Sequence, residues 1–485
     1  MNKHRSHFSV FLGCLLAVLT LNASAIELPD IGDSSGTTIT PEKERQLGAA
    51  FFRSLQGHGA ILEDLETQEY LQSIGRKLVL YSDDAGKNFT FFPIAAIAIN
   101  AFAAPGGFIG VNAGLILNTE TESELAGVLA HEISHVTQRH MARSFERAEQ
   151  LSMPMAVALI GSLLLGVASP DAGLAAMTAV TAGNVQGQIN FTRANEQEAD
   201  RVGMALLSRA EFDPEGMPSF FERLHIANRL TDPKFLPEFL RTHPVTTSRI
   251  ADSKNRLAEY PPHDHKNSDA YLLTKARIEV IAAKSPGQAV KIFKTALQEG
   301  DLGDADNATH YGYALALTGV GKYEKARKEL QQLLREDEEN VSYLLALADL
   351  ETRAGNFKKG LRVYRRLNSL FPGYRPVVMA FTKALLRFGQ VKQAKALLLD
   401  YGIKHGTDRI YYELLSEAEG RDGNTFEAHL ALAEYHYLSG ETEQAYNQLK
   451  IAERSGNLDY YHKQRLLARL EQMEKEMEEE KELQK

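Results

Sequence analysis

Cysteine is almost absent from this chain, and the position of the single cysteine excludes disulfides from the folded protein. Cys14 lies in an apolar run, 8–21, that follows Lys3 and Arg5 and precedes Ala23-Ser24-Ala25. A basic start, a short apolar region and a small-x-small site are typical of a secretory signal peptide, and the run is too short to span a membrane. Cleavage after Ala25 predicts a secreted, periplasmic chain without disulfides.

One alternative for the N-terminus stays open. Leu12-Gly13-Cys14 loosely resembles the cleavage box of a lipoprotein. Cleavage there would leave an unusually short apolar region, so the sequence favours the site after Ala25.

Positive charges are fewer than negative ones. The chain has 54 Lys and Arg residues against 63 Asp and Glu, a formal net charge of −9 that becomes −11 when Lys3 and Arg5 leave with the signal peptide. Nucleic-acid binding depends on clustered basic residues. The charge balance therefore indicates no nucleic-acid partner.

The chain does contain a metal-binding pattern. His131-Glu132-Ile133-Ser134-His135 is an H-E-x-x-H sequence in an apolar, Ala-rich run that begins at Leu125. Residues four apart share one face of a helix, so His131 and His135 can bind one metal ion. Glu132 then lies beside the open coordination position, where a carboxylate can take a proton from water. This is the minimal site of a zinc hydrolase.

A site of this kind needs a third protein ligand. The metzincin pattern requires glycine and histidine where Gln138 and Met141 stand, and His140 is out of register. The sequence therefore does not fit that class.

A later segment, Asn195-Glu196-Gln197-Glu198-Ala199-Asp200, offers another solution. Glu196 and Asp200 are four residues apart and share a helical face. Glu196 can complete a two-His, one-Glu site, while Asp200 can orient a ligand imidazole through a hydrogen bond. The alternative is a solvated acidic face, but the upstream H-E-x-x-H favours the metal site.

Three sequence blocks together resemble the HtpX-like zinc peptidases. They are the H-E-x-x-H pentapeptide, the segment E-Q-E-A-D at 196–200, and N-A-F-A-A-P-G-G-F-I-G-V at 100–111. The resemblance implies one zinc ion per chain, bound by His131, His135 and Glu196, with Glu132 as general base. With the helical repeats described below, it also implies misassembled outer-membrane β-barrel proteins as clients and the barrel-assembly machinery as partner.

The block upstream of the motif is rich in β-branched and aromatic residues. Residues 89–99 and 108–111 are strand candidates, and Pro105-Gly106-Gly107 predicts a turn between them. A hairpin here can offer an edge strand to an extended peptide substrate. An ordinary core hairpin is an equal alternative.

Charge is missing altogether from residues 151–170, a run long enough to be a transmembrane helix. Pro154, Gly161 and Gly166 interrupt this run, and the Ala-rich stretch that follows Asp171 is equally uncharged. We therefore favour a helical hairpin that packs on the zinc site or makes peripheral contact with a membrane or hydrophobic client. A true membrane span is the alternative.

A domain boundary is expected near Tyr260-Pro261-Pro262-His263, after which the sequence becomes helical and repetitive. Gly321-Lys322-Tyr323-x-x-Ala326 recurs at 355–360 and 389–394, at the 34-residue period of tetratricopeptide repeats. Irregular helices are expected to interrupt this register between Asp400 and Gly423. Ala289, Phe293 and Ala296 fit an earlier repeat, and Gly440 to Ala445 fit a late one.

His243 is a further site candidate, because Pro244 disfavours helix there and predicts a loop shortly after the metal-site helices. A loop histidine can occupy the fourth coordination position and keep the enzyme closed, or it can stabilise the developing oxyanion. A surface histidine without function is the third possibility.

The predicted fold is an α+β, zincin-like metallopeptidase domain, mostly helical with a small β-hairpin or sheet, followed by an all-α tetratricopeptide-repeat solenoid. The expected parts are a signal peptide at 1–25, the metallopeptidase domain at 26–262, the repeats at 263–470 and a charged tail at 471–485, to which no function is assigned.

The predicted function is that of a periplasmic zinc endopeptidase, for which the resemblance implies a chaperone-like role in outer-membrane protein assembly and quality control. A largely non-proteolytic, zinc-stabilised scaffold is one alternative, although a purely structural zinc site needs no general base such as Glu132. An intramembrane peptidase is another, which the signal peptide and the repeats disfavour.

Overall fold

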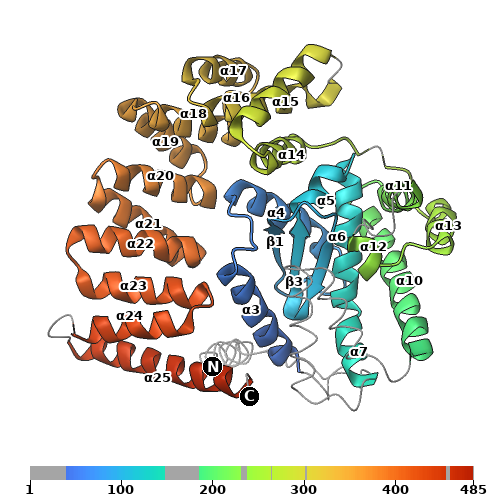
Figure 1. The fold of residues 1–485 in the computed structure, drawn as a ribbon, viewed down its shortest axis with the longest axis horizontal. Coiled ribbons are helices and arrows are strands. Elements are labelled where there is room, and N and C mark those ends of the chain that lie inside the picture. Colours follow the sequence, from blue (N-terminus) through green and yellow to red (C-terminus); the bar gives the residue numbers. More distant parts are fainter. Residues whose placement is uncertain are drawn as a thin grey trace, which may run out of the picture.

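The computed structural model describes residues 40–147, 185–230, 238–263, 265–300, 303–454 and 459–483. Within these residues, a mostly helical N-terminal half holds a three-stranded sheet, and a curved solenoid of paired helices follows it (Figure 1). This architecture confirms the predicted fold class. The proposed signal peptide and the uncharged run at 151–170 lie outside the described residues. Among the described helices, none combines the length and apolar content that a membrane crossing requires.

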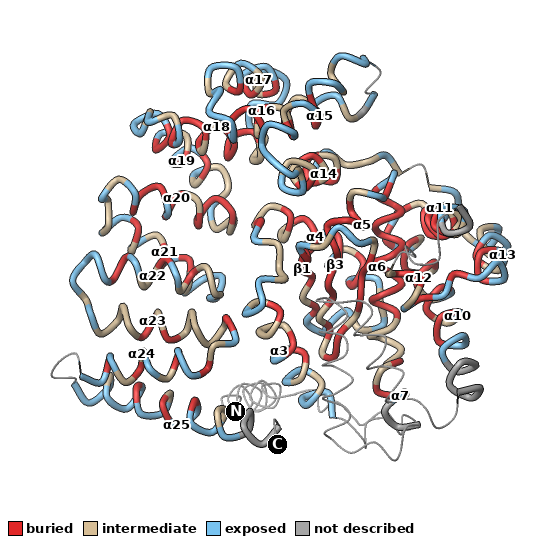
Figure 2. The backbone as a smooth tube through the Cα atoms, in the orientation of Figure 1, coloured by how far each residue is buried: buried red, intermediate tan, exposed pale blue. Residues whose placement is uncertain are grey.

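The sheet has the strand order β1-β3-β2. β1 (Thr90–Ile94) runs parallel to β3 (Phe108–Asn112), and β2 (Ala101–Ala104) runs antiparallel to β3. The strands are rich in aromatic and small apolar residues, and most of these are buried. The sheet therefore belongs to the core of the N-terminal half (Figure 2).

The predicted single hairpin between 89–99 and 108–111 is wrong. The first run splits, because β1 ends at Ile94 and a separate strand, β2, begins at Ala101. The turn at Pro105–Gly107 joins β2 to β3, with Gly106 and Gly107 at φ of 73° and 82°. β3 pairs in parallel with β1 and antiparallel with β2. Composition alone does not distinguish this arrangement from a hairpin.

Two helices at the start of the described chain lie between the sheet and the solenoid (Figure 1). α3 spans Pro41–Gly57, and α4 spans Leu65–Leu80. The side chain of Asp64 caps α4 by accepting a hydrogen bond from Thr67 N at 2.9 Å. α4 packs against β1 on one side and against the solenoid on the other.

The remaining helices of the N-terminal half surround a long central helix, α6 (Glu122–Thr137). Most of α6 is buried in the core that also includes parts of α4, β3 and α10 (Figure 2). The helices around α6 are α5 (Ala113–Asn118), α7 (His140–Arg147), α10 (Val185–Arg209), α11 (Gly216–Leu230), α12 (Glu238–Thr242) and α13 (Thr247–Arg256).

The solenoid consists of antiparallel helix pairs. Its inner curve faces α3 and α4 (Figure 1). The pairs are α14 (Asp269–Ala282) with α15 (Pro286–Glu299), α16 (Asp306–Gly319) with α17 (Tyr323–Glu336), α18 (Val341–Arg353) with α19 (Phe357–Leu370), α20 (Arg375–Arg387) with α21 (Val391–His405), α22 (Arg409–Asp422) with α23 (Thr425–Leu438), and α24 (Thr442–Arg454) with α25 (Tyr460–Leu483).

The 34-residue period corresponds to a glycine turn between the two helices of a pair. Gly321, Gly355 and Gly389 have φ of 74°, 79° and 72°, a left-handed conformation that favours glycine. Ala326 and Ala394 are fully buried where neighbouring helices meet, as the repeat pattern predicts.

The predicted interruption between Asp400 and Gly423 is wrong. Residues 391–405 and 409–422 form regular helices, and Gly423, with φ of 86°, stands 34 residues after Gly389. The charged tail predicted at 471–485 continues α25 to Leu483.

Arginines of the solenoid contact an acidic segment, residues 63–69, at the start of α4. Arg277 of α14 donates to Asp64 Oδ1 at 3.1 Å and lies 2.8 Å from Glu66 Oε1. Arg409 of α22 pairs with Glu63, and Arg375 of α20, one repeat earlier, donates to Gln68 Oε1 at 2.9 Å. The solenoid is therefore anchored to the N-terminal half by charge as well as by packing.

A second anchor lies at the first turn of α6. Glu122 accepts hydrogen bonds from Tyr70 of α4 at 3.0 Å and from the hydroxyl of Ser268 at 2.7 Å. His265 Nε2 lies 3.0 Å from the same carboxylate. Ser268 also caps α14, so the first helix of the solenoid begins at the carboxylate that starts α6.

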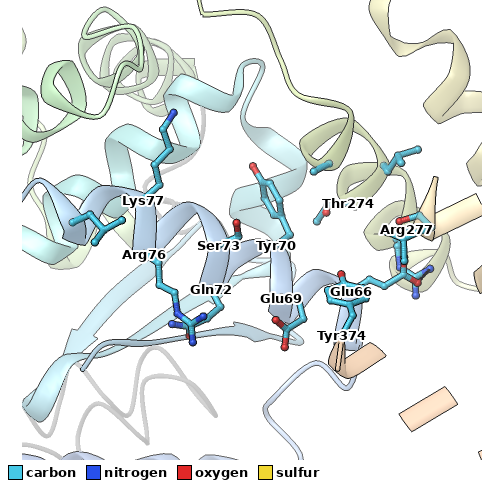
Figure 3. Close-up of a pocket in the computed structure, with 15 residues that line it drawn as sticks. Glu66, Glu69, Tyr70, Gln72, Ser73, Arg76, Lys77, Thr274, Arg277 and Tyr374 are labelled. Atoms are coloured by element: carbon cyan, nitrogen blue, oxygen red, sulfur yellow. Dashed lines mark ion pairs between the residues drawn. The ribbon is translucent and has the colours of Figure 1, made fainter. Parts of the chain in front are cut away.

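A cavity of about 550 Å³ remains between α4 and the solenoid (Figure 3). Burial raises the pKa of the Glu66 carboxyl in its wall, although the charge of Arg277 opposes this effect. None of the lining residues belongs to the H-E-x-x-H motif. The inner face of the solenoid is thus only partly filled by α4.

Removing the guanidinium of Arg277 should destabilise the protein. Arg277→Met would leave the carboxylates of Asp64 and Glu66, which are 10% and 11% exposed, without their main counter-charge. We expect a loss of about 3 kcal/mol in the free energy of unfolding, measured by urea titration, the lower end of the range for breaking a buried pair because Arg277 is itself 18% exposed.

The matched control is Arg353→Met, because Arg353 pairs with Asp349 at the surface, where the two side chains are 54% and 48% exposed. This change should cost at most ~0.5 kcal/mol. Equal losses in the two variants would contradict a stabilising role for the Arg277 pair.

Candidate metal centre and active site

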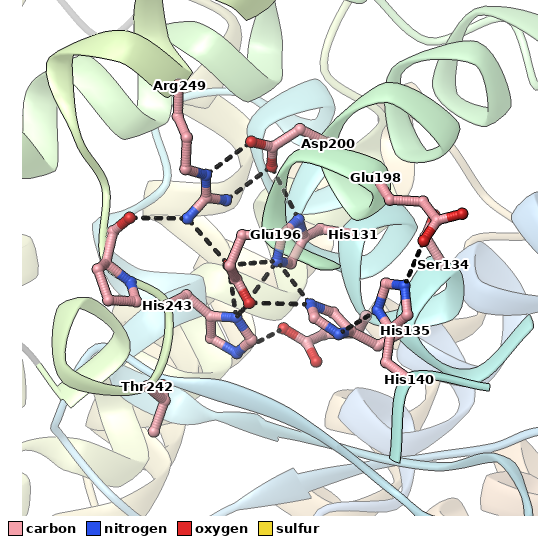
Figure 4. A network of polar contacts seen from close by, with 12 residues as sticks. His131, Ser134, His135, His140, Glu196, Glu198, Asp200, Thr242, His243 and Arg249 are labelled. Atoms are coloured by element: carbon pink, nitrogen blue, oxygen red, sulfur yellow. Dashed lines mark hydrogen bonds and ion pairs between the residues drawn. The ribbon is translucent and has the colours of Figure 1, made fainter. Parts of the chain in front are cut away.

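Helix α6 presents the H-E-x-x-H motif from a buried position. Its N-terminus is capped by Thr121, whose hydroxyl accepts from Glu124 N at 3.2 Å. The Nε2 atoms of His131 and His135 lie 3.1 Å apart, so both imidazoles face one point, as the i, i+4 spacing predicts (Figure 4).

Helix α10 brings the third predicted ligand to the same point. Glu196 Oε2 lies 3.4 Å from His131 Nε2, and Glu196 Oε1 lies 3.4 Å from His135 Nε2. A glycine permits this approach, because a Cβ at Gly203 would lie 3.2 Å from the backbone of both Ala130 and His131. A larger residue there would push α10 away from α6 at the level of the ligands.

The loop after α12 adds His243, of which the side chain is 11% exposed. His243 Nδ1 lies 3.1 Å from both carboxylate oxygens of Glu196 and 3.3 Å from His131 Nε2. Its ring packs on that of Phe239, a fully buried residue, at a centroid distance of 5.0 Å. The structure therefore places His243 in the site and not on the surface.

The donor set fits a divalent metal ion. One atom each from His131, His135, Glu196 and His243 can be chosen so that all four lie within 4.8 Å of one another. A tetrahedral zinc ion keeps its ligand atoms roughly 3.3 Å apart, given zinc–ligand bonds of about 2.0–2.1 Å. The separations between the ligand atoms, 3.1–3.4 Å, are close to that spacing.

Glu132 occupies the place expected of a general base. Its side chain is 1% exposed, and Oε1 has no hydrogen-bond partner among the described residues. His243 Nε2 lies 3.5 Å from this oxygen. A buried carboxylate oxygen without a partner is costly unless it serves a water or substrate, which is the chemistry that the motif requires.

Asp200 and Arg249 lie behind the ligands. Asp200 Oδ1 lies 3.0 Å from His131 Nδ1, the ring nitrogen that faces away from the ligand cluster. Arg249, on α13, donates two hydrogen bonds of 2.7 Å to the Asp200 carboxylate and lies 2.9 Å from Glu196 Oε2. It also donates to Pro244 O at 3.0 Å, and so links the His243 loop to the metal-site helices.

The buried charges shift the titration of the site. Burial alone lowers the pKa of His131, but hydrogen bonds and charge from Asp200 and Glu196 outweigh it and raise the pKa to about 9. Burial and the neighbouring His131 lower the pKa of His135 well below its usual value, so its lone pair is available. Burial raises the pKa of Glu196, yet His243 and His131 hold it well below the usual range. The site thus attracts a cation.

The structure brings together all six residues singled out from the sequence: Glu132, His131, His135, Glu196, Asp200 and His243. Sequence reasoning missed Arg249. The available signal was the pair Glu196 and Asp200, because two buried carboxylates four residues apart require a counter-charge. No role was predicted for His140, which is out of register with the metzincin pattern. None was predicted for Glu198, which could belong to a solvated acidic face.

The sequence of the whole chain agrees with this geometry. Residues 65–257 match the profile of peptidase family M48. The beta-barrel assembly-enhancing protease of Escherichia coli (strain K12) is 36% identical over 452 residues, which cover 93% of this chain and 92% of the relative. The chain belongs to peptidase family M48. The mitochondrial metalloendopeptidase OMA1 of Schizosaccharomyces pombe is 30% identical over 193 residues, 40% of this chain and 54% of the relative.

Membership of family M48 makes the chain a metallopeptidase and confirms the resemblance drawn from the three sequence blocks, which all lie within 65–257. A solved structure of a tetratricopeptide repeat protein from Parabacteroides merdae is 15% identical to this M48 peptidase. The match covers 51% of this chain and 97% of the other, with a TM-score of only 0.28. The repeat assignment therefore depends on the helix pairs and the 34-residue period described above.

The raised pKa of His131 makes metal affinity dependent on pH. Below its pKa of about 9 the metal-free imidazole carries a proton, and this proton must leave when a metal binds. Zinc affinity should therefore rise by about tenfold per pH unit between pH 7 and 8, measured by competition with a chelator of known pH dependence.

Asp200→Asn is the matched variant, because it removes a carboxylate that raises the pKa of His131. The pH dependence should become weaker in this variant. An affinity that does not change with pH in the unmodified protein would show that His131 is not a protonated ligand of the metal-free site.

Proposed function

We propose that this M48 peptidase is a zinc endopeptidase in which His131, His135 and Glu196 bind one zinc ion and Glu132 is the general base. The observation that carries the proposal is the meeting of two imidazole Nε2 atoms and a carboxylate beside Glu132, of which Oε1 has no hydrogen-bond partner among the described residues. A bound zinc ion would polarise the scissile carbonyl and acidify a water.

The side chains of the chain then have separate tasks. Glu132 takes the proton of the attacking water and passes it to the leaving amine. Asp200 holds the ring of His131 through Nδ1, which keeps Nε2 directed at the ligand point. Arg249 neutralises Asp200 and Glu196, because two carboxylates this close would otherwise repel each other in the buried site.

His243 gives the site a closed state. As a fourth ligand its neutral imidazole takes the position that the attacking water needs, and the enzyme is inactive until the loop moves. The distances from His243 Nδ1 to Glu196 and His131 support this role. The oxyanion role is the second candidate, and Nε2, which lies nearer to Glu132, supports it.

We expect an extended substrate to pair with β2, an edge strand of the described sheet. β2 packs against α6, so a peptide added there would run past the metal helix with little dependence on its sequence. A role of this strand in the core alone is the alternative.

We infer a role in outer-membrane protein assembly and quality control, with a chaperone-like component. The name of the E. coli relative, which matches almost the whole chain, supports it. In this proposal the chain acts in the periplasm after cleavage at Ala25, misassembled β-barrel proteins are its clients, and the solenoid contacts clients or assembly machinery. A scaffold with little proteolysis is the alternative.

Glu132→Gln tests the mechanism. The amide cannot accept the proton of the water, so casein cleavage should fall by at least ~10²-fold, while zinc content measured on the purified protein stays at one per chain. His131→Ala, His135→Ala and Glu196→Ala should instead lose zinc.

Glu329→Gln on α17 is a matched control and should retain both zinc and cleavage, because Glu329 contacts His310 in the solenoid. An active Glu132→Gln enzyme would rule out the general base. Full zinc occupancy in Glu196→Ala would mean that the third ligand is misassigned.

His243→Ala separates the two roles of the loop histidine. In the closed-state role the variant keeps zinc and cleaves casein or itself faster, because the fourth position is free. In the oxyanion role it keeps zinc and loses ~10²–10³-fold in rate. Thr242→Ala, which removes a hydroxyl that donates to the α12 carbonyls of Glu238 and Phe239, should leave the rate unchanged. A His243→Ala variant with unchanged rate would exclude both roles.

A further inference from the structure

His140 lies against the metal site although its sequence position suggests otherwise. It follows His135 by five residues, and on a continuous helix a residue five positions on is rotated by ~140° and faces away. The helix is interrupted before His140: α6 ends at Thr137, Arg139 has a φ of 51°, and α7 begins at His140. This break turns the His140 ring back onto His135, and the residue is only 4% exposed.

The ring of His140 connects His135 to a carboxylate. Its Nδ1 lies 2.9 Å from His135 Nδ1, and its Nε2 lies 3.2 Å from Glu198 Oε2 (Figure 4). Arg143, one turn further along α7, donates to the same oxygen of Glu198 at 2.7 Å. His135, His140 and Glu198 thus form a chain of polar contacts from the metal helix α6 through α7 to α10.

When His135 binds a metal through Nε2, only one arrangement of protons makes both of these contacts hydrogen bonds. His135 must then carry its proton on Nδ1 and donate it to His140 Nδ1, which accepts through its lone pair. His140 must carry its own proton on Nε2 and donate it to Glu198. Every ring nitrogen has one role, and the carboxylate at the end is held by Arg143.

We propose that His140 is a positioning residue of the metal site, which accepts the Nδ1 proton of His135, fixes the ring with Nε2 facing the metal, and is itself held by Glu198. The proposal rests on His135 being a zinc ligand, as proposed above. It gives His135 the support that Asp200 gives His131, so each ligand histidine is oriented by a separate side chain from outside the ligand set.

The test measures zinc affinity of the full-length protein by chelator competition, with thermal unfolding of the metal-free and zinc-loaded forms. His140→Ala should weaken zinc binding by ~10–100-fold, the usual effect of losing a hydrogen-bond partner of a ligand. The rise in Tm that zinc produces should shrink accordingly. His140→Asn should recover most of the affinity, because its Oδ1 can accept where Nδ1 of the imidazole accepts.

His310→Ala is the matched control, since His310 forms a comparable contact of 2.7 Å with Glu329 in the solenoid, away from the metal site. It should leave zinc affinity unchanged. His135→Ala separates the two proposals: if it keeps full zinc affinity, the proposed metal site itself fails.

Two results would overturn the role of His140 while leaving the metal site intact. The first is unchanged zinc affinity in His140→Ala when His135→Ala has lost zinc. The second is a His140→Asn variant as weak as His140→Ala, with metal-free Tm lowered in both, which would assign His140 to the packing of α7 and not to the orientation of His135.

Discussion

The close approach of α6 and α10 is the constraint on which the rest of the site depends. Neither helix holds a complete site, because α6 supplies two imidazoles and Glu132, while α10 supplies Glu196 and Asp200. The helices meet at Gly203, where even a methyl group would press on the backbone at Ala130. The distance between them sets the distance between the ligands, and every other contact refines a geometry that this packing creates.

The second determinant is electrostatic. Glu132, Glu196 and Asp200 are three almost fully buried carboxylates, and Arg249 is the permanent positive charge that contacts two of them. A divalent cation would bring this group of four side chains to formal neutrality. Burying unbalanced charge is expensive, so the folded site is arranged around a positive charge that the protein supplies only in part.

The sequence predicted those parts of the site in which spacing dictates geometry. The i, i+4 pairs His131 with His135 and Glu196 with Asp200 needed only a helix to become neighbours, and the 34-residue glycine period needed only a turn. Strand pairing was mispredicted, because nothing local distinguishes a parallel β1–β3 pair from a hairpin. His140 and Arg249 were missed because a left-handed residue at Arg139 and the fold of α13 bring them in, and neither leaves a periodic signal.

The shared carboxylate of Glu122 has a consequence for the boundary expected near residue 262. Glu122, in the first turn of the metal helix, accepts hydrogen bonds from Tyr70 of α4 on one side and from Ser268, at the start of the solenoid, on the other. A chain ending at 262 would leave this carboxylate with Tyr70 and without the Ser268 hydroxyl and the His265 imidazole. Through Ser268, which caps α14 and donates to Glu122, the repeats thus contact the same helix that carries His131 nine residues further on.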